Sequence, residues 1–147
     1  MRLVVQKVNN CKVIDQSSGN FNEIENGLLV YIGISKDCSE EKLKRVAEKL
    51  VKIRVFPGKD KNFEKSIKDV NGEILIISNF TLFGFLKGNR PNFKKSLEYE
   101  KALNYFDFFV NLVKKNYDEH KIKTGFFGAK MLVKSEIDGP TNLVLDF

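Results

Sequence analysis

Two apolar stretches decide the fold class of this chain: LLVYIGI at residues 28–34 and ILIIS at residues 74–78. Nearly every position in both stretches is apolar, which is typical of strands that are buried on both faces of a sheet. Such strands must be covered by other elements, because a sheet is stable only when its apolar faces are packed. The two stretches therefore predict the centre of a mixed sheet.

Amphipathic helices follow each of these strands. Ser39 can cap the first helix, which we expect to run to about Ile53 before Phe56-Pro57-Gly58 interrupts it. Its apolar residues recur at helical spacing, at Leu43, Val46, Ala47 and Leu50. A second helix is expected from about Ser96, with one face formed by Tyr99, Ala102, Leu103, Phe106, either Phe109 or Val110, and Val113.

The remaining strands are shorter and lie towards the two ends of the chain. Residues 2–8 and 11–15 predict a hairpin that turns at Asn9-Asn10, and Phe21–Ile24 predicts a short strand after the loop at 16–20. Further strand-like segments are at Phe63, 121–125, 129–135 and 141–146. We expect one domain over residues 1–147, with an α/β (α+β mixed) fold.

Composition limits the class of protein. Hydrophobic residues make up 42% and charged residues 30%, which is ordinary for a soluble globular domain. No apolar run approaches the roughly 20 residues of a membrane span, and Met1–Val5 reads as a strand rather than a signal peptide. The net charge of +6 favours an anionic partner such as RNA without showing one. We expect a cytoplasmic protein.

Familiar catalytic machinery is missing. The single histidine, His120, lies in a charged stretch and is expected at the surface, so a Ser-His-Asp triad has no base. Cys11 and Cys38 stand far apart, which gives neither a disulfide framework nor a zinc site. Glycine-rich nucleotide-binding motifs are also absent. An enzyme with this sequence must work mainly through binding, positioning and main-chain electrostatics.

One polar segment lies where a buried strand ends. Ser78-Asn79-Phe80-Thr81-Leu82 leads into the loop FGFLKGNRPNF at residues 83–93, which carries Lys87 and Arg90. Exposed loops after buried strands often carry binding sites. The hydroxyls and main-chain N–H groups can bind a developing oxyanion, or the hydroxyls can simply satisfy nearby backbone groups.

A second segment, Asp138-Gly139-Pro140-Thr141, is expected in a loop before the last strand. A Gly-Pro pair usually marks a turn. It can also offer main-chain oxygens that no Cβ shields from a ligand. The sequence alone leaves both interpretations open.

In their order and spacing, these segments resemble the D-aminoacyl-tRNA deacylase family. The resemblance covers nearly the whole chain. It rests on Met1–Val8, Asn26–Leu29, Gly33, Ser78–Leu82, Lys87–Phe93, Thr124–Met131 and Asp138–Pro140.

The resemblance implies a fold, an activity and a set of site residues. The fold is a barrel-like mixed sheet with two long helices, forming a homodimer without a cofactor. The activity is hydrolysis of the ester in D-aminoacyl-tRNA, and of glycine wrongly attached to tRNA. Gly139 and Pro140, with a cis bond, would reject L-residues in the partner's site. Ser78, Phe80 and Thr81 would face the ester, and Phe127 and Met131 would hold the terminal adenine.

The mechanism implied needs no side-chain nucleophile, because the ester is activated and the ribose 2′-OH can orient water. A nucleophilic Thr81 is the alternative, although no base is available to activate it. Lys87 and Arg90, with Lys94 and Lys95, can contact tRNA phosphates or belong to a solvated loop. No metal, membrane or DNA partner is expected.

Two departures from the family bear on the site. The family usually has Gln where Asn79 stands, and Arg where Lys7 supports the Gly-Pro segment; lysine cannot reproduce a bidentate clamp. Two alternatives therefore remain. One is a non-catalytic RNA- or nucleotide-binding module, and the other is an editing enzyme with altered amino-acid specificity.

Overall fold

The two apolar stretches form neighbouring parallel strands in the computed structural model, which describes residues 1–147. They are β3 (Gly27–Gly33) and β6 (Glu73–Ser78). The main sheet has the order β10-β1-β3-β6-β9, so these two strands lie inside it, as predicted. Leu28, Ile32, Ile74 and Ile76 are fully buried. The parallel pair is the rigid base from which the segment at Ser78 emerges.

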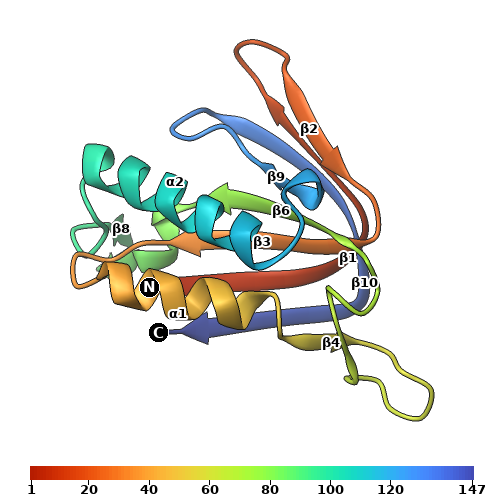
Figure 1. The fold of residues 1–147 in the computed structure, drawn as a ribbon. Coiled ribbons are helices and arrows are strands. Elements are labelled where there is room, and N and C mark those ends of the chain that lie inside the picture. Colours follow the sequence, from red (N-terminus) through yellow and green to blue (C-terminus); the bar gives the residue numbers. More distant parts are fainter.

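Both helices lie side by side on one face of this sheet (Figure 1). α1 (Glu40–Leu50) begins at Ser39, whose hydroxyl accepts a hydrogen bond from the Lys42 N–H at 3.3 Å. Its four predicted inward-facing residues are the buried ones. α1 ends at Leu50, earlier than predicted, because the chain leaves it for strand β4 (Arg54–Phe56).

α2 (Tyr99–Asn116) begins three residues later than predicted, because Ser96 forms a bridge with Ser35 and its hydroxyl donates to the Phe80 carbonyl. Its buried residues are Phe106, Phe109, Val110 and Val113, whereas Tyr99 is 58% exposed. Neither helix is long and apolar enough to cross a membrane.

The predicted hairpin at residues 2–15 is wrong. These residues form one continuous strand, β1 (Arg2–Asp15). Its first half pairs with β3, and its second half pairs with β2 (Phe21–Ile24). Register shifts near Asn9 let the strand bend instead of turning back. Asn9-Asn10 tolerates a tight turn, but long-range pairing along the whole strand prevails over that local tendency.

The C-terminal segments form a second long strand. β10 (Met131–Asp146) pairs with β1 along almost its entire length. The predicted loop at Gly139-Pro140 is therefore an irregularity inside a strand: residues 138–141 bulge out opposite Lys7, between the pairs Gln6–Asn142 and Val8–Ile137. The first and last residues of the chain meet, with the Phe147 N–H donating to the Met1 carbonyl at 2.9 Å.

The bend of β1 and β10 carries them over the other face of the sheet and gives the predicted barrel-like shape. The Asn22 side chain of β2 donates to the Thr124 carbonyl of β9 (Ile122–Thr124) at 2.8 Å, which links the two ends of the sheet. A second buried cluster fills this side, formed by Val8, Cys11, Val13, Ile24, Leu29, Leu75 and Ile77.

Small elements complete the fold. β4 pairs with β5 (Lys65–Ser66), close to the strand predicted at Phe63. A short 3-10 helix, η1 (Phe80–Phe83), follows β6 and precedes the hairpin of β7 (Phe85–Lys87) and β8 (Arg90–Asn92). A second 3-10 helix, η2 (Glu119–Lys121), follows α2.

Candidate active site

A cavity of about 600 Å³ lies at the end of β6, where η1 begins. It brings together four predicted site residues, Ser78, Phe80, Phe127 and Met131, with Asn79 beside them. Most of the lining is apolar, and no lining residue carries a charged side chain. We call this cavity the ester cavity. It can bind an uncharged, partly aromatic group and orient it with a few polar atoms.

Asn79 fixes the backbone at the start of η1, beside the ester cavity. Its N–H donates to the Ile32 carbonyl at 2.8 Å, which continues the sheet pairing past Ser78. Its side-chain oxygen accepts hydrogen bonds from the Thr81 hydroxyl and, at 3.1 Å, from the Thr81 N–H. Asn79 thus caps η1. Thr81 does not line the cavity, and both of its donors are already used within the chain.

Phe80 has the main-chain N–H that remains free. The first N–H of a helix has no partner within it, and the Phe80 N–H has no acceptor elsewhere in the chain. On the other side of the residue, the Phe80 carbonyl accepts from the Ser96 hydroxyl at 2.9 Å. The ring lies edge-on to Phe93, with 5.1 Å between centroids. An unpaired main-chain N–H of a residue that lines the cavity can stabilise a developing negative charge on oxygen.

Aromatic rings form the apolar wall. Phe127 contacts Tyr99 and Phe106, with ring centroids 5.3 and 5.5 Å apart. The Met131 sulfur accepts from the Phe126 N–H at 3.2 Å, which holds this flexible side chain in place. A planar ring in this cavity that contacts Phe127 and Met131 would gain dispersion and stacking.

Sequence reasoning missed three residues of this cavity. Ser96 was assigned to a helix start, yet it is 9% exposed and anchors Phe80. Tyr99 was assigned to the buried helix face, yet it borders the cavity. Tyr31 lies inside a strand; burial raises the pKa of its phenol, so it remains an uncharged donor at neutral pH. These roles depend on contacts with residues that are distant in the sequence, so local sequence patterns do not reveal them.

Gly139 and Pro140 do not line the ester cavity of their own chain. The 138–141 bulge lies opposite Lys7 of β1, and Lys7 pairs with Leu28 of β3. Ser78 of β6 pairs with Ile32, further along β3. Leu28 and Ile32 are four residues apart, which is about 13 Å along the strand. β10 and β6 are three strand spacings apart, which adds about 14 Å across the sheet. The bend of β10 lies at the opposite end of the sheet from the β7–β8 hairpin (Figure 1).

The geometry of the bulge leaves main-chain oxygens accessible. Gly139 has a φ of +117°, a region that L-residues with a Cβ rarely adopt. The Gly139-Pro140 bond is cis, and both residues are exposed. The Lys7 ammonium lies 2.9 Å from the Asp138 carboxylate, so Lys7 supports the residue that precedes Gly139.

The remaining candidate groups lie outside the cavity. Lys87 and Arg90 pair across the exposed β7–β8 hairpin. His120 is at the surface as predicted, with its side chain 86% exposed. Burial raises the pKa of the Cys11 thiol to about 11, which keeps it protonated at neutral pH. No three His, Cys, Asp or Glu side chains are grouped so as to hold a metal ion.

Comparison with known proteins identifies the family. A family model described as D-Tyr-tRNA(Tyr) deacylase matches residues 4–146. A D-aminoacyl-tRNA deacylase of Thermosipho africanus (strain TCF52B) is 43% identical over 147 residues, covering 99% of this chain and 97% of the relative. A protein of the same name from Clostridium perfringens (strain SM101 / Type A) is 42% identical over 149 residues, with the same coverage.

Solved structures agree on the fold. One described as a c-Myc DNA unwinding element binding protein superposes with a TM-score of 0.94 at 35% identity, covering 100% of this chain and 99% of that one. One described as a probable eukaryotic D-amino acid tRNA deacylase gives 0.88 at 19% identity, covering 99% and 98%, which shows the fold alone. With the family model matched almost end to end and relatives 42% and 43% identical, the chain belongs to the D-Tyr-tRNA(Tyr) deacylase family of enzymes.

Proposed function

We propose that this chain hydrolyses the ester of D-aminoacyl-tRNA in the cytoplasm, releasing the free D-amino acid and tRNA. The observation that carries the proposal is the ester cavity: an uncharged, largely apolar pocket lined by Phe80, whose main-chain N–H is unpaired. Family membership supplies the class of substrate. The cavity has room for a nucleoside and supplies a main-chain donor for the acyl oxygen.

The substrate is oriented from its adenosine end. Phe127 and Met131 take the terminal adenine, which places the ester towards Ser78 and Phe80. As water attacks the acyl carbon, negative charge grows on the carbonyl oxygen, and the Phe80 N–H donates to it. The ribose 2′-OH helps to orient that water. Thr81 acts as a positioning residue for η1, because its hydroxyl is bonded to Asn79 and no base lies beside it.

Discrimination against L-residues needs a second copy of the chain. Gly139 and Pro140 of the partner subunit enter the ester cavity in this proposal, and their main-chain oxygens hold the substrate's α-amino group. An L side chain would then point into rigid backbone, whereas any D side chain points away from it. The distance of the bulge from its own cavity supports an arrangement across a homodimer. Glycine, without a side chain, would also be accepted.

A paired deacylation assay tests this function. Purified protein is mixed with D-Tyr-tRNA, L-Tyr-tRNA and Gly-tRNA at equal concentration, and remaining aminoacyl-tRNA is measured with time. We expect rapid loss of D-Tyr-tRNA and Gly-tRNA and none of L-Tyr-tRNA above spontaneous hydrolysis. Equal loss of the two tyrosyl esters would refute chiral selection. No turnover of any ester would favour a non-catalytic RNA-binding module.

A further inference from the structure

A second cavity lies beside the ester cavity. Its volume is about 360 Å³, and it is lined by Ser35, Lys36, Asp37, Phe83, Lys94 and Lys95. All three lysines are exposed. We call this group the lysine cavity. None of these lysines lines the ester cavity, so the two cavities differ completely in charge.

The same two segments of chain form walls of both cavities. In one segment Ile34 lines the ester cavity and Lys36 lines the lysine cavity. In the other, Phe93 and Ser96 line the ester cavity, and Lys94 and Lys95, between them, line the lysine cavity. The segments are joined by a bridge between Ser35 and Ser96, and the Lys36 N–H donates to the Lys95 carbonyl at 3.2 Å.

This joint holds the two cavities at a fixed distance. Ser35 and Ser96 are 5% and 9% exposed, and the Ser96 hydroxyl also anchors the Phe80 carbonyl. The backbone that carries the lysines is therefore hydrogen-bonded to the residue that carries the free N–H. The lysine cavity is therefore the basic site that adjoins the ester cavity across this joint.

The lysine cavity has a net positive charge. Its one carboxylate, Asp37, already faces other cations: the Lys42 ammonium lies 3.8 Å away, and the N-terminal ammonium of Met1 also contributes to the field at Asp37. Asp37 therefore does not neutralise the three lysines. A polyanion is the ligand that such a site attracts.

We propose that Lys36, Lys94 and Lys95 bind the phosphodiester groups of the unpaired 3′ end of tRNA, immediately upstream of the adenosine in the ester cavity. The proposal rests on the proposed function and adds the site that holds the RNA backbone. Lys87 and Arg90, on the exposed hairpin beyond, would meet phosphates further along the tRNA. Phosphate contacts fix the position of a nucleic acid without reading its sequence, which suits an enzyme acting on many tRNAs.

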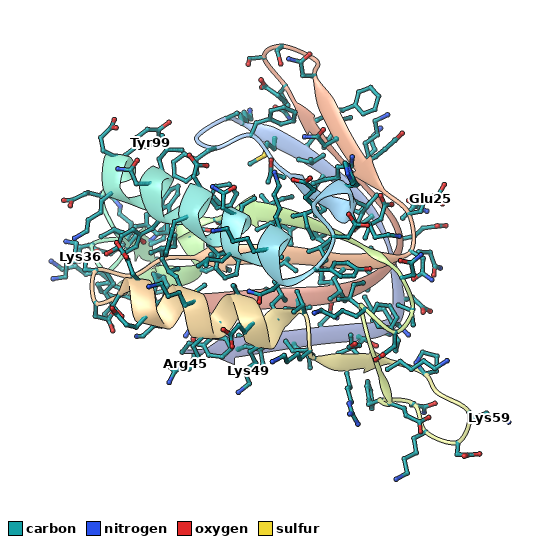
Figure 2. All side chains as sticks on the ribbon, in the orientation of Figure 1. Glu25, Lys36, Arg45, Lys49, Lys59 and Tyr99 are labelled. Atoms are coloured by element: carbon teal, nitrogen blue, oxygen red, sulfur yellow. The ribbon has the colours of Figure 1, made fainter.

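Two substrates separate phosphate binding from ester chemistry. D-Tyr-tRNA carries the full 3′ end, whereas 3′-O-(D-tyrosyl)adenosine carries the same ester and base without any phosphate. The variant Lys36→Gln/Lys94→Gln/Lys95→Gln removes three positive charges from exposed side chains. A control variant, Lys59→Gln/Lys61→Gln/Lys65→Gln, makes the same charge change in the β4–β5 region. Figure 2 shows Lys36 and Lys59 at opposite ends of the molecule.

For the lysine-cavity variant, we expect KM for D-Tyr-tRNA to rise roughly tenfold or more with kcat unchanged. The slope of log kcat/KM against log salt concentration should become shallower by about 2, at roughly 0.7 for each single-strand phosphate that a lysine no longer neutralises. Turnover of the adenosine ester should stay as in the wild type. In the control variant, the slope should change by less than half as much as in the lysine-cavity variant.

Other outcomes would overturn the proposal in distinguishable ways. An unchanged KM and salt slope in the lysine-cavity variant, or equal effects in both triple variants, would reject the lysine cavity as a phosphate site. A parallel loss on both substrates would mean that the lysines act on the ester cavity rather than on phosphates. If the wild type hydrolyses neither substrate, the proposed function itself fails, whatever the variants do. Circular dichroism melting checks that each variant is folded.

Discussion

At the scale of single residues, the proposed role of Phe80 depends on its backbone rather than on its ring. The residue begins η1, its carbonyl is held by Ser96, and its N–H has no acceptor in the chain. The ring is 57% exposed. A main-chain donor leaves no mark in a sequence, because every residue except proline has one. Substitution by proline is therefore the direct way to test it.

Phe80→Pro should lower kcat by a factor on the order of 10² or more, the usual effect of removing one oxyanion donor. Proline is well suited to the first position of a helix, and Asn79 before it is already extended, with φ −144° and ψ 94°. Phe80→Ala is the matched control, because it removes the ring and keeps the N–H. Steady-state deacylation of D-Tyr-tRNA measures both. Equal losses in the two variants would assign the effect to the ring.

Residue-level predictions from the sequence depended on chain position. Ser78, Phe80, Phe127 and Met131 were expected at the site because of the resemblance to the deacylase family, and the structure brings them to one cavity. The role of Ser96 was missed, since its partner is 16 residues away and is a carbonyl, which any residue type supplies.

At the scale of elements, the bend shared by β1 and β10 was the main feature that sequence patterns could not supply. The apolar periodicity gave the central strands and the inner face of α1 correctly, because these depend on neighbours three or four residues apart or on continuous burial. Whether Asn9 and Gly139 turn the chain or bend a strand depends on pairing with residues more than 120 positions away. Local turn propensity has no information on that pairing.

The ion pair between the two bent strands should control selectivity. Lys7→Ala leaves the Asp138 carboxylate without its partner at 2.9 Å, which loosens the 138–141 bulge. We expect the preference for D-Tyr-tRNA over L-Tyr-tRNA to fall several-fold, with a stability loss of about 1 kcal/mol. Lys7→Arg should keep the selectivity of the wild type, since arginine retains a positive charge opposite the Asp138 carboxylate.

Lys12→Ala provides the control on the same strand. It breaks the more exposed pair with Glu23, at 3.3 Å, without touching the bulge. For each variant, the deacylation rates of D-Tyr-tRNA and L-Tyr-tRNA are measured, and stability is measured by urea unfolding. If Lys12→Ala changes selectivity as much as Lys7→Ala, the Lys7–Asp138 pair has no special role.

At the scale of the whole molecule, the central claim is that one site is assembled from two chains. The ester cavity and the 138–141 bulge lie at different ends of the sheet, so the proposed chiral site needs the bulge of a second chain. In a two-fold dimer, each chain would supply the cavity of one site and the bulge of the other. Two defects placed on different chains would then fall in the same site.

Complementation by mixed dimers tests this claim most directly. Phe80→Pro removes the donor, and Gly139→Ala adds a Cβ at a φ of +117°, where it would lie 2.7 Å from the Thr141 hydroxyl oxygen. The two variants are co-expressed with different tags, and doubly tagged dimers are purified and assayed with D- and L-Tyr-tRNA. One site then holds both substitutions and the other holds none.

We predict that each variant alone is inactive or non-selective, and that the mixed dimer recovers about half of the wild-type rate, with full selectivity for the D-ester. A mixed dimer as defective as its parents would contradict the account, since it would place the N–H and the Gly-Pro bulge in one chain's site.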